Sequence, residues 1–522
     1  MSDAQRWKPR ANPWVVAIIV TLGAFMEVLD TTIVNVSLPH IAGSLSISSD
    51  EATWTLTTYL VANGIVLTIS GALSRRLGRK NYFLICVGGF TAASLACGIS
   101  TNFGEILLFR ALQGFFGGGL QPTQQSIILD HFPAEKRQQA FSLTAIAIII
   151  APVVGPVLGG YLTDTYSWHW IFLINVPIGI GTFLGVMQFV EDSPRIEQEK
   201  KTAPRFDYWG IFFISLALGC LEVGTDRGED YDWLGSTFIR VMFILSACGF
   251  LFGITYLLNV RNPVVNLRVF KDRNFALGSL QIAMMGFVLY ASAVLIPQFA
   301  QGQLNYTATW AGLVLAPGAV VLTMLIPMVG KILNFVKTKY VIACGGLALA
   351  LALFYSMDLV SNLDFYHLML YRAAQTAGLA LLFVPISTIA YATIKPELNG
   401  DAAALFTMAR NVFGGIGISV STALVTEHMQ TRQSRLIDNL SPTLQPYNEL
   451  LQQIQQGLVD LGQSSAQAVQ NAPGQVYQML QTQSAVLAYT DVFLITGAMA
   501  LLMIPAALMM SGVKAKARGG AH

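Results

Sequence analysis

Long apolar runs separated by short polar stretches occupy the chain from residue 13 onward. A helix needs about 20 mostly apolar residues to cross the hydrocarbon core of a bilayer. The runs predict fourteen membrane-spanning helices, at residues 13–36, 52–72, 82–100, 104–128, 140–162, 170–190, 207–225, 236–258, 275–300, 309–330, 340–357, 365–391, 401–426 and 486–511. Because this number is even, both ends of the chain are expected on the same side of the membrane.

Composition indicates a polytopic membrane protein as well. Of the 522 residues, 54% are hydrophobic and 11% are charged, whereas a soluble domain carries about 25% charged residues. The net charge is +2 and the basic residues are scattered over short loops, so the lipid bilayer is an expected partner and nucleic acid is not. The five cysteines lie inside apolar runs and the six histidines lie far apart, so neither a metal site nor a cofactor is expected.

Lysine and arginine predict the orientation. Loops on the side of the two termini carry 24 of these residues, and loops on the opposite side carry three. Basic loops remain in the cytoplasm, so both termini are predicted to be cytoplasmic. The first apolar run is too long for a signal-peptide core and is expected to stay as an uncleaved anchor.

Three short matches recur in order, with offsets between 256 and 262 residues: 52–54 with 308–310, 110–114 with 372–378, and 155–160 with 414–417. They map the first six spans onto the last six and leave two spans as an insertion. The predicted fold is all-α, with two six-helix bundles and two inserted helices. The predicted boundaries are a cytoplasmic N-terminus 1–12, a first bundle 13–190, a linker 191–206, inserted helices 207–258, a linker 259–274, a second bundle 275–511 and a tail 512–522.

Two carboxylates interrupt the first apolar run. Glu27 and Asp30 are three residues apart, so they share one face of a helix. A charge near the bilayer centre costs roughly 2.5–3.5 kcal/mol, so such residues face a bundle interior, a partner or water. The pair suggests proton coupling. The alternative is that both carboxylates only hold the first helix against its neighbours through hydrogen bonds.

An arginine in the fourth span is expected at the same depth as Asp30. The first span runs outward and the fourth runs inward, which places Arg110 and Asp30 about equally far from the outer face. An unpaired arginine there would be costly, so the two are predicted to interact. Protonation of Asp30 would loosen this pair and create a switch. A permanent structural ion pair is an equal alternative.

The fifth span contains prolines and glycines in close succession. Proline removes a backbone donor and kinks a helix, and glycine lets a neighbouring helix approach. This combination predicts a hinge at the interface of the two bundles, formed by Pro152, Gly155, Pro156, Gly159 and Gly160.

A short basic turn joins spans two and three. Its arginines could meet helix C-termini or lipid phosphates, which predicts a cytoplasmic latch formed by Gly71, Arg75, Arg76, Gly78 and Arg79. A simple positive-inside anchor would explain most of the same charges.

These segments together resemble the major facilitator superfamily, in particular its fourteen-span drug:proton antiporter branch and the EmrB-type exporters within it. The likeness covers the whole chain and rests on LDTTIVNVSLP at 29–39, GALSRRLGRK at 71–80, RALQG at 110–114, APVVGPVLGG at 151–160, WHWIFLINVPIG at 168–179 and the two inserted spans. Ser74 departs from the loop motif, which usually has an aspartate there, and this weakens the expected latch.

The resemblance implies the major facilitator fold in a bacterial inner membrane, and export of hydrophobic or amphipathic drugs in exchange for protons by alternating access. It places the acid of the first-span motif at Asp30, the fourth-span arginine at Arg110 and the antiporter motif at Gly155, Pro156, Gly159 and Gly160.

Other function classes fit the sequence less well. An ATP-driven pump needs a GxxxxGK[ST] loop, which is absent, and no cluster of nucleophile and base or of metal ligands predicts an enzyme. A dedicated metabolite exporter and a proton-coupled uptake permease of the same fold stay open. Soft side chains that could line an adaptable drug cavity are Met26, Phe115, Phe116, Met284, Met285, Tyr290 and Asn411.

The only long hydrophilic stretch is the outer, periplasmic loop 427–485. Apolar residues recur in it at helical spacing, at Leu450, Leu451, Ile454, Leu458 and Leu461. They predict an amphipathic helix that folds back through turns near Gly462 and Pro473-Gly474. A self-packed hairpin and a docking surface are equal alternatives. EmrB-type exporters pass cargo to an EmrA-like periplasmic adaptor and an outer-membrane channel, so the resemblance suggests this loop as the adaptor site.

Overall fold

The computed structural model describes residues 10–201, 207–360, 363–438, 440–441 and 443–511. These residues form α-helices and short 3-10 turns, and none of them lies in a β-strand. The first half comprises α1(Pro13–Leu45), α2(Ser49–Leu77), α3(Arg79–Gly98), α4(Phe103–Gly117), α5(Leu120–His131), α6(Ala134–Thr165), α7(Trp170–Leu173) and α8(Asn175–Phe189). Next come α9(Pro194–Lys201), α10(Tyr208–Asp226), η2(Trp233–Gly235), α11(Thr237–Asn259) and η3(Leu267–Lys271). The second half comprises α12(Arg273–Gly302), α13(Ala308–Leu313), α14(Ala316–Phe335), α15(Thr338–Tyr355), α16(Phe365–Tyr391), η4(Pro396–Leu398), α17(Asn399–Ile437), α18(Gln445–Asp460) and α19(Ser465–Leu508).

Twelve helices in the described part of the chain are long and apolar enough to cross a membrane, and the bent helix α6 makes thirteen. The predicted count of fourteen is therefore not confirmed, because the predicted span 104–128 is divided between α4 and α5. The break falls at Gly118 and Gly119. A Cβ on Gly118 would lie 2.4 Å from the backbone oxygen of Asn63, so glycine permits α2 to approach here.

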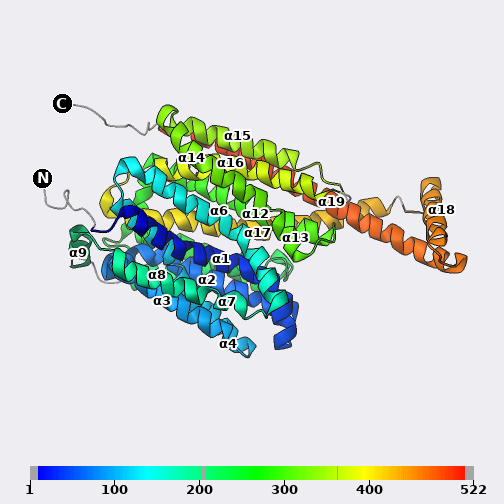
Figure 1. Cartoon of the computed structure of the whole chain (residues 1–522), viewed down its shortest axis with the longest axis horizontal. Coiled ribbons are helices and arrows are strands. Elements are labelled where there is room, and N and C mark those ends of the chain that lie inside the picture. The colour runs from blue at the N-terminus through cyan, green and yellow to red at the C-terminus, as the bar shows by residue number, and fades with distance from the viewer. Residues whose placement is uncertain (1–9, 202–206, 361–362, 439, 442, 512–522) are drawn as a thin grey trace.

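The two halves lie side by side with their helices roughly aligned (Figure 1). In the first half α1 packs against α6 and α8, and in the second α12 packs against α17 and α16. Helices α10 and α11 pack on each other, and α10 also contacts α2 and α17, one helix from each half. The predicted domain boundaries stay predictions, and their parts at 1–9, 202–206 and 512–522 lie outside the described residues.

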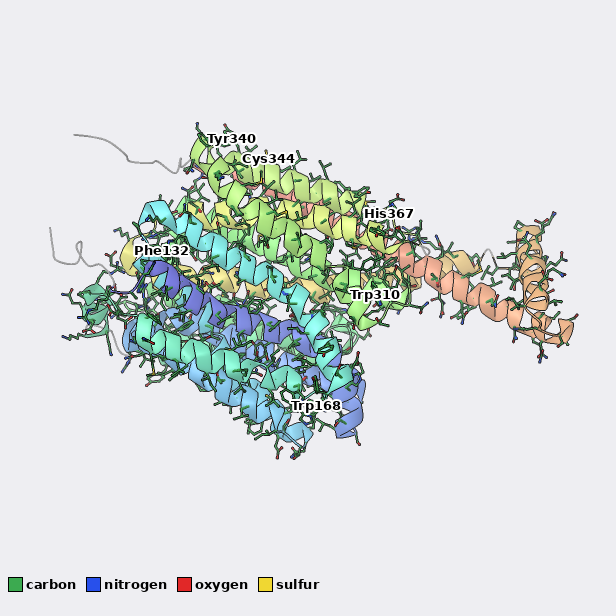
Figure 2. All side chains as sticks on the ribbon, in the orientation of Figure 1. Phe132, Trp168, Trp310, Tyr340, Cys344 and His367 are labelled. Carbon is green, nitrogen blue, oxygen red and sulfur yellow. The ribbon has the colours of Figure 1, made fainter. Side chains whose placement is uncertain are left out.

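The outside of the molecule is apolar between its two ends. Helix α11, for example, leaves Ile244, Leu251 and Phe252 more than half exposed, as expected where lipid replaces water. Large aromatic side chains lie toward both ends: Phe132 and Tyr340 near one, Trp168 and Trp310 near the other (Figure 2). Of these, Tyr340 and Trp310 are about half exposed, as in an aromatic belt at the membrane interfaces, whereas Phe132 and Trp168 are buried.

The long hydrophilic loop is helical. Helix α17 continues to Ile437, and α19 extends well beyond the bundle, with α18 across its tip (Figure 1). Gly462 forms the expected turn with φ of +95°. The second expected turn is wrong, because Pro473 and Gly474 lie inside α19. We call this end of the molecule the hairpin end, and the end where α1 begins and α19 finishes the basic end.

Candidate functional site

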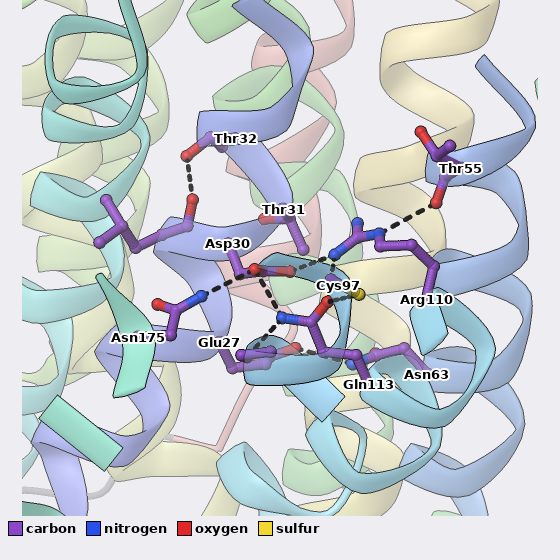
Figure 3. A network of polar contacts seen from close by, with 12 residues as sticks. Glu27, Asp30, Thr31, Thr32, Thr55, Asn63, Cys97, Arg110, Gln113 and Asn175 are labelled. Carbon is purple, nitrogen blue, oxygen red and sulfur yellow. Dashed lines mark hydrogen bonds and ion pairs between the residues drawn. The ribbon is translucent and has the colours of Figure 1, made fainter. Parts of the chain in front are cut away.

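Asp30 lies on α1, completely buried, and accepts three hydrogen bonds. The donors are Arg110 Nη1 at 2.6 Å, Gln113 Nε2 at 2.8 Å and Asn175 Nδ2 at 2.9 Å. Figure 3 shows these side chains converging on the carboxylate from α4 and α8. A buried carboxylate is stable when paired and hydrogen-bonded in this way. The predicted contact between Arg110 and Asp30 is thus present.

Arg110 is also fully buried and fixed from several sides. Its Nε donates to the backbone oxygen of Thr55 at 3.1 Å, and its Nη1 also reaches Gln113 Oε1 at 2.7 Å. The guanidinium carbon lies 4.2 Å from the ring centre of Tyr59 and 5.6 Å from that of Phe172. This arginine therefore holds α1, α2 and α4 together around Asp30.

Glu27 lies one turn away on α1 but belongs to a different network. Its carboxylate accepts hydrogen bonds from Asn63 Nδ2 at 2.9 Å and from Gln121 Nε2 on α5. Gln121 Oε1 in turn accepts from Arg410 Nη2 on α17. Asn411 Oδ1 accepts from Arg410 Nε and Nη2, both at 3.1 Å. Through one glutamine, the carboxylate of the first half is linked to a buried cation of the second.

The glycines of α6 pack against α1 next to the acidic pair. A Cβ on Gly155 would lie 2.2 Å from Thr32 Oγ1, and one on Gly159 would lie 2.7 Å from the backbone oxygen of Ile33. Gly160 and Pro152 are buried, Pro156 is half-buried, and α6 bends by 41° beside Pro152. The opposite face of α6 meets the second half, where Val157 closely approaches Gly312 of α13.

The basic turn lies at the contact between the halves. Arg75 Nη1 lies 2.6 Å from Asp401 Oδ1 on α17, and a Cβ on Gly71 would lie 2.9 Å from the backbone oxygen of Gly400. Ser74 donates to the oxygen of Gly71 at 3.1 Å. The predicted latch residues Gly71 and Arg75 thus touch α17 directly.

The remaining latch residues stay within the first half. Arg79 is fully buried, pairs with Asp130 and donates to the oxygen of Ser126 at 2.9 Å. Gly78 has φ of +85° beside Asp192, and the backbone N–H of Lys80 donates to Asp192 Oδ1 at 3.0 Å. Burial raises the pKa of Asp192, and the Lys80 N–H acts in the opposite direction. Arg76 is exposed and makes an interaction of its own.

The predicted substrate residues do not all lie together. Met26 and Met285 are fully buried and Met284 nearly so, while Tyr290 covers Gly414 and lies with Asn411 near Arg410. Phe115 lies away from the others: it is 49% exposed on the same side of α4 as Leu108 and Leu112, and its contact with substrate stays a prediction. Phe116 packs on Gly89 of α3. A hollow of about 540 Å³ is lined by none of them but by Tyr306, Trp310, Phe365, Tyr366 and Met369.

The apolar stripe of α18 faces its own hairpin. Leu458 is 4% exposed and packs against Ala468 and Ala472 of α19, with Leu451 and Ile454 beside it. Leu450 is half-buried, and Leu461 is 83% exposed, outside the stripe. The stripe therefore stabilises the hairpin itself, and contact with a partner stays a prediction.

Several residues of the site were not singled out from the sequence. Asn63, Gln121, Asn175 and Arg410 are polar residues inside apolar runs, and that is the signal that would have found them. The inserted helix α10 adds Glu222, which is 9% exposed and faces Gly415 of α17. Asp226 follows one turn later and accepts a hydrogen bond from Thr57 of α2.

The arrangement has two features. Two buried carboxylates can each take up a proton, and one of them is linked through Gln121 to the cation Arg410 of the other half. No group of three or more metal-ligating side chains occurs within the described ranges. The chemistry available here is proton binding and release coupled to contacts between helices.

Comparison with known proteins agrees with this architecture. Residues 20–418 match the Major Facilitator Superfamily family model. The chain is 32% identical over 491 residues to the multidrug export protein EmrB of Escherichia coli strain K12, covering 94% of each chain. It is 31% identical over 499 residues to the fatty acid resistance protein FarB of Neisseria gonorrhoeae, covering 95% of this chain and 96% of FarB.

Solved structures show the same fold. A double tryptophan mutant of XylE superposes with a TM-score of 0.61 at 14% identity over 97% of both chains. The human organic anion transporter MFSD10 gives a TM-score of 0.57 at 13% identity, over 94% of this chain and all of MFSD10. With the family model, the curated relatives and the fold in agreement, this chain belongs to the major facilitator superfamily of membrane transporters.

Proposed function

We propose that this protein is a proton-coupled multidrug exporter that works by alternating access, in the inner membrane of a bacterium. The observation that carries this proposal is the pair of buried carboxylates on α1, one of which is linked to the second half through Gln121 and Arg410. The similarity to the multidrug export protein EmrB supports drugs as the cargo.

Coupling follows from the different environments of the two carboxylates. Asp30 is held entirely within the first half by Arg110, Gln113 and Asn175. The link from Glu27 to Arg410 crosses between the halves. A proton on Glu27 cancels its charge and weakens this link. The two halves can rock against each other only when contacts between them, such as this link, are broken.

The drug would bind between the halves, near Glu27. Tyr290 and Asn411 lie close to Arg410, and Met26, Met284 and Met285 are buried. Soft and aromatic side chains of this kind adapt to varied hydrophobic ligands. A cationic or neutral amphipathic drug and a proton would then compete for the same carboxylate.

The positive-inside rule places the basic end in the cytoplasm and the hairpin end outside. In this conformation the basic end is closed by Arg75 with Asp401 and by Tyr391, whose hydroxyl donates to Gln125 Oε1 at 2.8 Å. The hairpin of α17, α18 and α19 would then project into the periplasm. There it would reach an EmrA-like adaptor that connects to an outer-membrane channel.

Transport measurements in proteoliposomes test the function. The purified protein is reconstituted, a pH gradient is imposed, and movement of ethidium, a fluorescent lipophilic cation, is followed. We expect dye to move against its gradient as protons run down theirs. Asp30→Asn keeps the shape of the side chain but cannot ionise, so it should abolish this coupled movement. Because Arg110 then lacks its counter-charge, the rate is compared per amount of folded protein, measured by monodisperse yield and Tm.

Glu105→Gln serves as the matched control, because Glu105 is a partly exposed carboxylate in the first turn of α4, away from the buried pair. It should transport at the wild-type rate. Wild-type rates with Asp30→Asn would refute the coupling role, and dye that moves together with protons would instead support an uptake permease. Indifference to dyes with proton-driven movement of one metabolite would support a dedicated exporter.

A further inference from the structure

The two halves contain matching polar clusters. Arg372, Gln375 and Ser356 each stand 262 residues after Arg110, Gln113 and Ser94. Gln113 Nε2 donates to Ser94 Oγ at 2.8 Å in the first half, and Gln375 Nε2 donates to Ser356 Oγ at 2.9 Å in the second. The repeat of the sequence is thus a repeat of side-chain contacts.

One position breaks this correspondence. The residue 262 positions after Asp30 is Ser292. Arg110 Nη1 binds Asp30 Oδ2 at 2.6 Å, whereas Arg372 Nη1 binds Ser292 Oγ at 2.8 Å. A hydroxyl has replaced the carboxylate, so the charge of Arg372 has lost the counter-charge that its counterpart has.

No other charged group among the described residues takes the place of the missing carboxylate. Arg372 is 1% exposed and Ser292 is 3% exposed. Nε and Nη2 of Arg372 have no hydrogen-bond acceptor among the described residues, and no carboxylate of these residues forms an ion pair with it. Gln375 Oε1 is likewise buried without a donor. Of these unused groups, the two arginine nitrogens are donors and can bind an anion, whereas the glutamine oxygen is an acceptor and cannot.

Arginine cannot relieve this cost by losing its proton, because its pKa is too high in proteins. A buried unpaired charge is among the most unfavourable arrangements in a fold. The replacement of a carboxylate by a hydroxyl frees the space of only a few atoms, and the site is enclosed. These conditions fit a small anion with a single charge.

We propose that Arg372 and Ser292 form a binding site for chloride, which neutralises the second half where Asp30 neutralises the first. The guanidinium donors Nε and Nη2, which are unused, would hold the ion, while Nη1 stays bonded to the Ser292 hydroxyl that stands in place of the carboxylate. This site lies apart from Glu27 and Asp30, and it does not depend on the proposed transport function.

Thermal stability of the full-length protein in detergent tests the site without any transport assay. The protein is exchanged into sodium gluconate at pH 7, and chloride replaces gluconate at constant ionic strength. An ion that binds only the folded state stabilises it, so we expect a saturable rise in Tm of about 2 °C or more. Bromide should act in the same way.

Ser292→Asp is the decisive variant, because it restores the carboxylate that Asp30 provides in the first half. It should melt higher than the wild type in gluconate and lose the increment with chloride. Arg240→Gln is the control, since Arg240 is exposed on α11 and, within the described ranges, bonds Ser236 and Thr237 of its own helix end. It should keep the full increment.

Equal Tm values of the wild type in chloride and gluconate would overturn the proposal, as would a full chloride increment in Ser292→Asp. The same melting measurement is also made with sodium formate in place of gluconate. Stabilisation by formate but not by chloride would also overturn the halide assignment, because it would identify a site for a carboxylate group.

Discussion

Asp30 and Glu27 lie one turn apart on α1, but their partners differ in kind. Asp30 is satisfied by three side chains of its own half, whereas Glu27 is linked through Gln121 to Arg410 of the other half. An amide at position 27 keeps the shape but cannot ionise. We expect Glu27→Gln to weaken dye export or narrow the range of exported dyes while the protein folds normally. Unchanged rates across several dyes of different charge would contradict this role.

The pair of Arg110 and Asp30 permits a test of whether it is a permanent structural ion pair or a proton-dependent switch. Arg110→Ala leaves a buried carboxylate without its counter-charge, which typically costs about 3–5 kcal/mol. We therefore expect severe loss of folded protein in this variant, measured by monodisperse yield and Tm. The double variant Arg110→Ala with Asp30→Ala should recover much of the yield but no coupled transport. Transport by the double variant would show that the pair is structural only.

Gly155 illustrates how one side chain can obstruct a helix contact. Its Cβ would lie 2.2 Å from Thr32 Oγ1, so Gly155→Leu forces α6 away from α1. We expect turnover to fall more than substrate binding does. Gly181→Leu is the control, because nothing lies within 4 Å of a Cβ there. Lost binding with normal turnover of the bound fraction would assign Gly155 to the drug site instead.

Among the elements, the hairpin of α17, α18 and α19 departs most from a bundle of spans. Leu458 packs on Ala468 and Ala472, so α18 folds onto α19 without help from the membrane. Nearer the bundle, Asp491 of α19 accepts two bonds from Arg432 Nη2, both at 2.9 Å, and one from His428 Nδ1 at 3.0 Å. The base of the hairpin is thus fastened separately from its tip.

This separation allows the tip to be removed cleanly. Gln433 Nε2 of α17 donates to the Tyr477 hydroxyl of α19 at 3.1 Å, so the two helices lie side by side at this level. A short Gly/Ser linker can therefore join residues 437 and 476 in place of 438–475. We expect this variant to insert and to transport dye in vesicles, but to lose co-purification with the adaptor and drug resistance in cells. A control with a linker only at the Gly462 turn should keep both. Retained adaptor binding after the excision would move the docking site to other outer loops.

At the scale of the whole molecule, the basic end is where the two halves are joined by charge. Arg75 and Asp401 lie 2.6 Å apart, with side chains 20% and 4% exposed. Such a pair contributes about 1 kcal/mol to the closed state, which changes the equilibrium between the closed and the open basic end about fivefold. Arg75→Ala should therefore increase opening of this end by about that factor.

The rate of thiol modification at Ala403→Cys, in a background without other cysteines, measures this opening, because Ala403 is fully buried two residues after Asp401. Lys331→Ala should leave the rate unchanged, since Lys331 is exposed on α14. The swapped pair Arg75→Asp with Asp401→Arg should restore the slow rate. A rate that is unaffected by Arg75→Ala would show that packing at Gly71 and Gly400 closes this end alone.

The sequence by itself determined the properties that depend on local pattern. Apolar runs of about 20 residues fix most of the spans, because no other structure satisfies the backbone in lipid. Depth along two antiparallel spans placed Arg110 beside Asp30. Spacing along α18 predicted an amphipathic helix, and Gly462 supplied the turn.

Only the tertiary structure decided which polar groups meet across the halves. Glu27 and Arg410 are joined by Gln121, and Arg75 is joined to Asp401, over hundreds of residues. No periodicity encodes such contacts, since they depend on how whole helices pack. Phe115 shows the converse: its chemistry suits a drug cavity, but the packing of α4 leaves its side chain 49% exposed on the outside of the helix. The sequence repeat matches Arg372 with Arg110. Only the surroundings of Arg372 in the structure show that it lacks a counter-charge among the described residues.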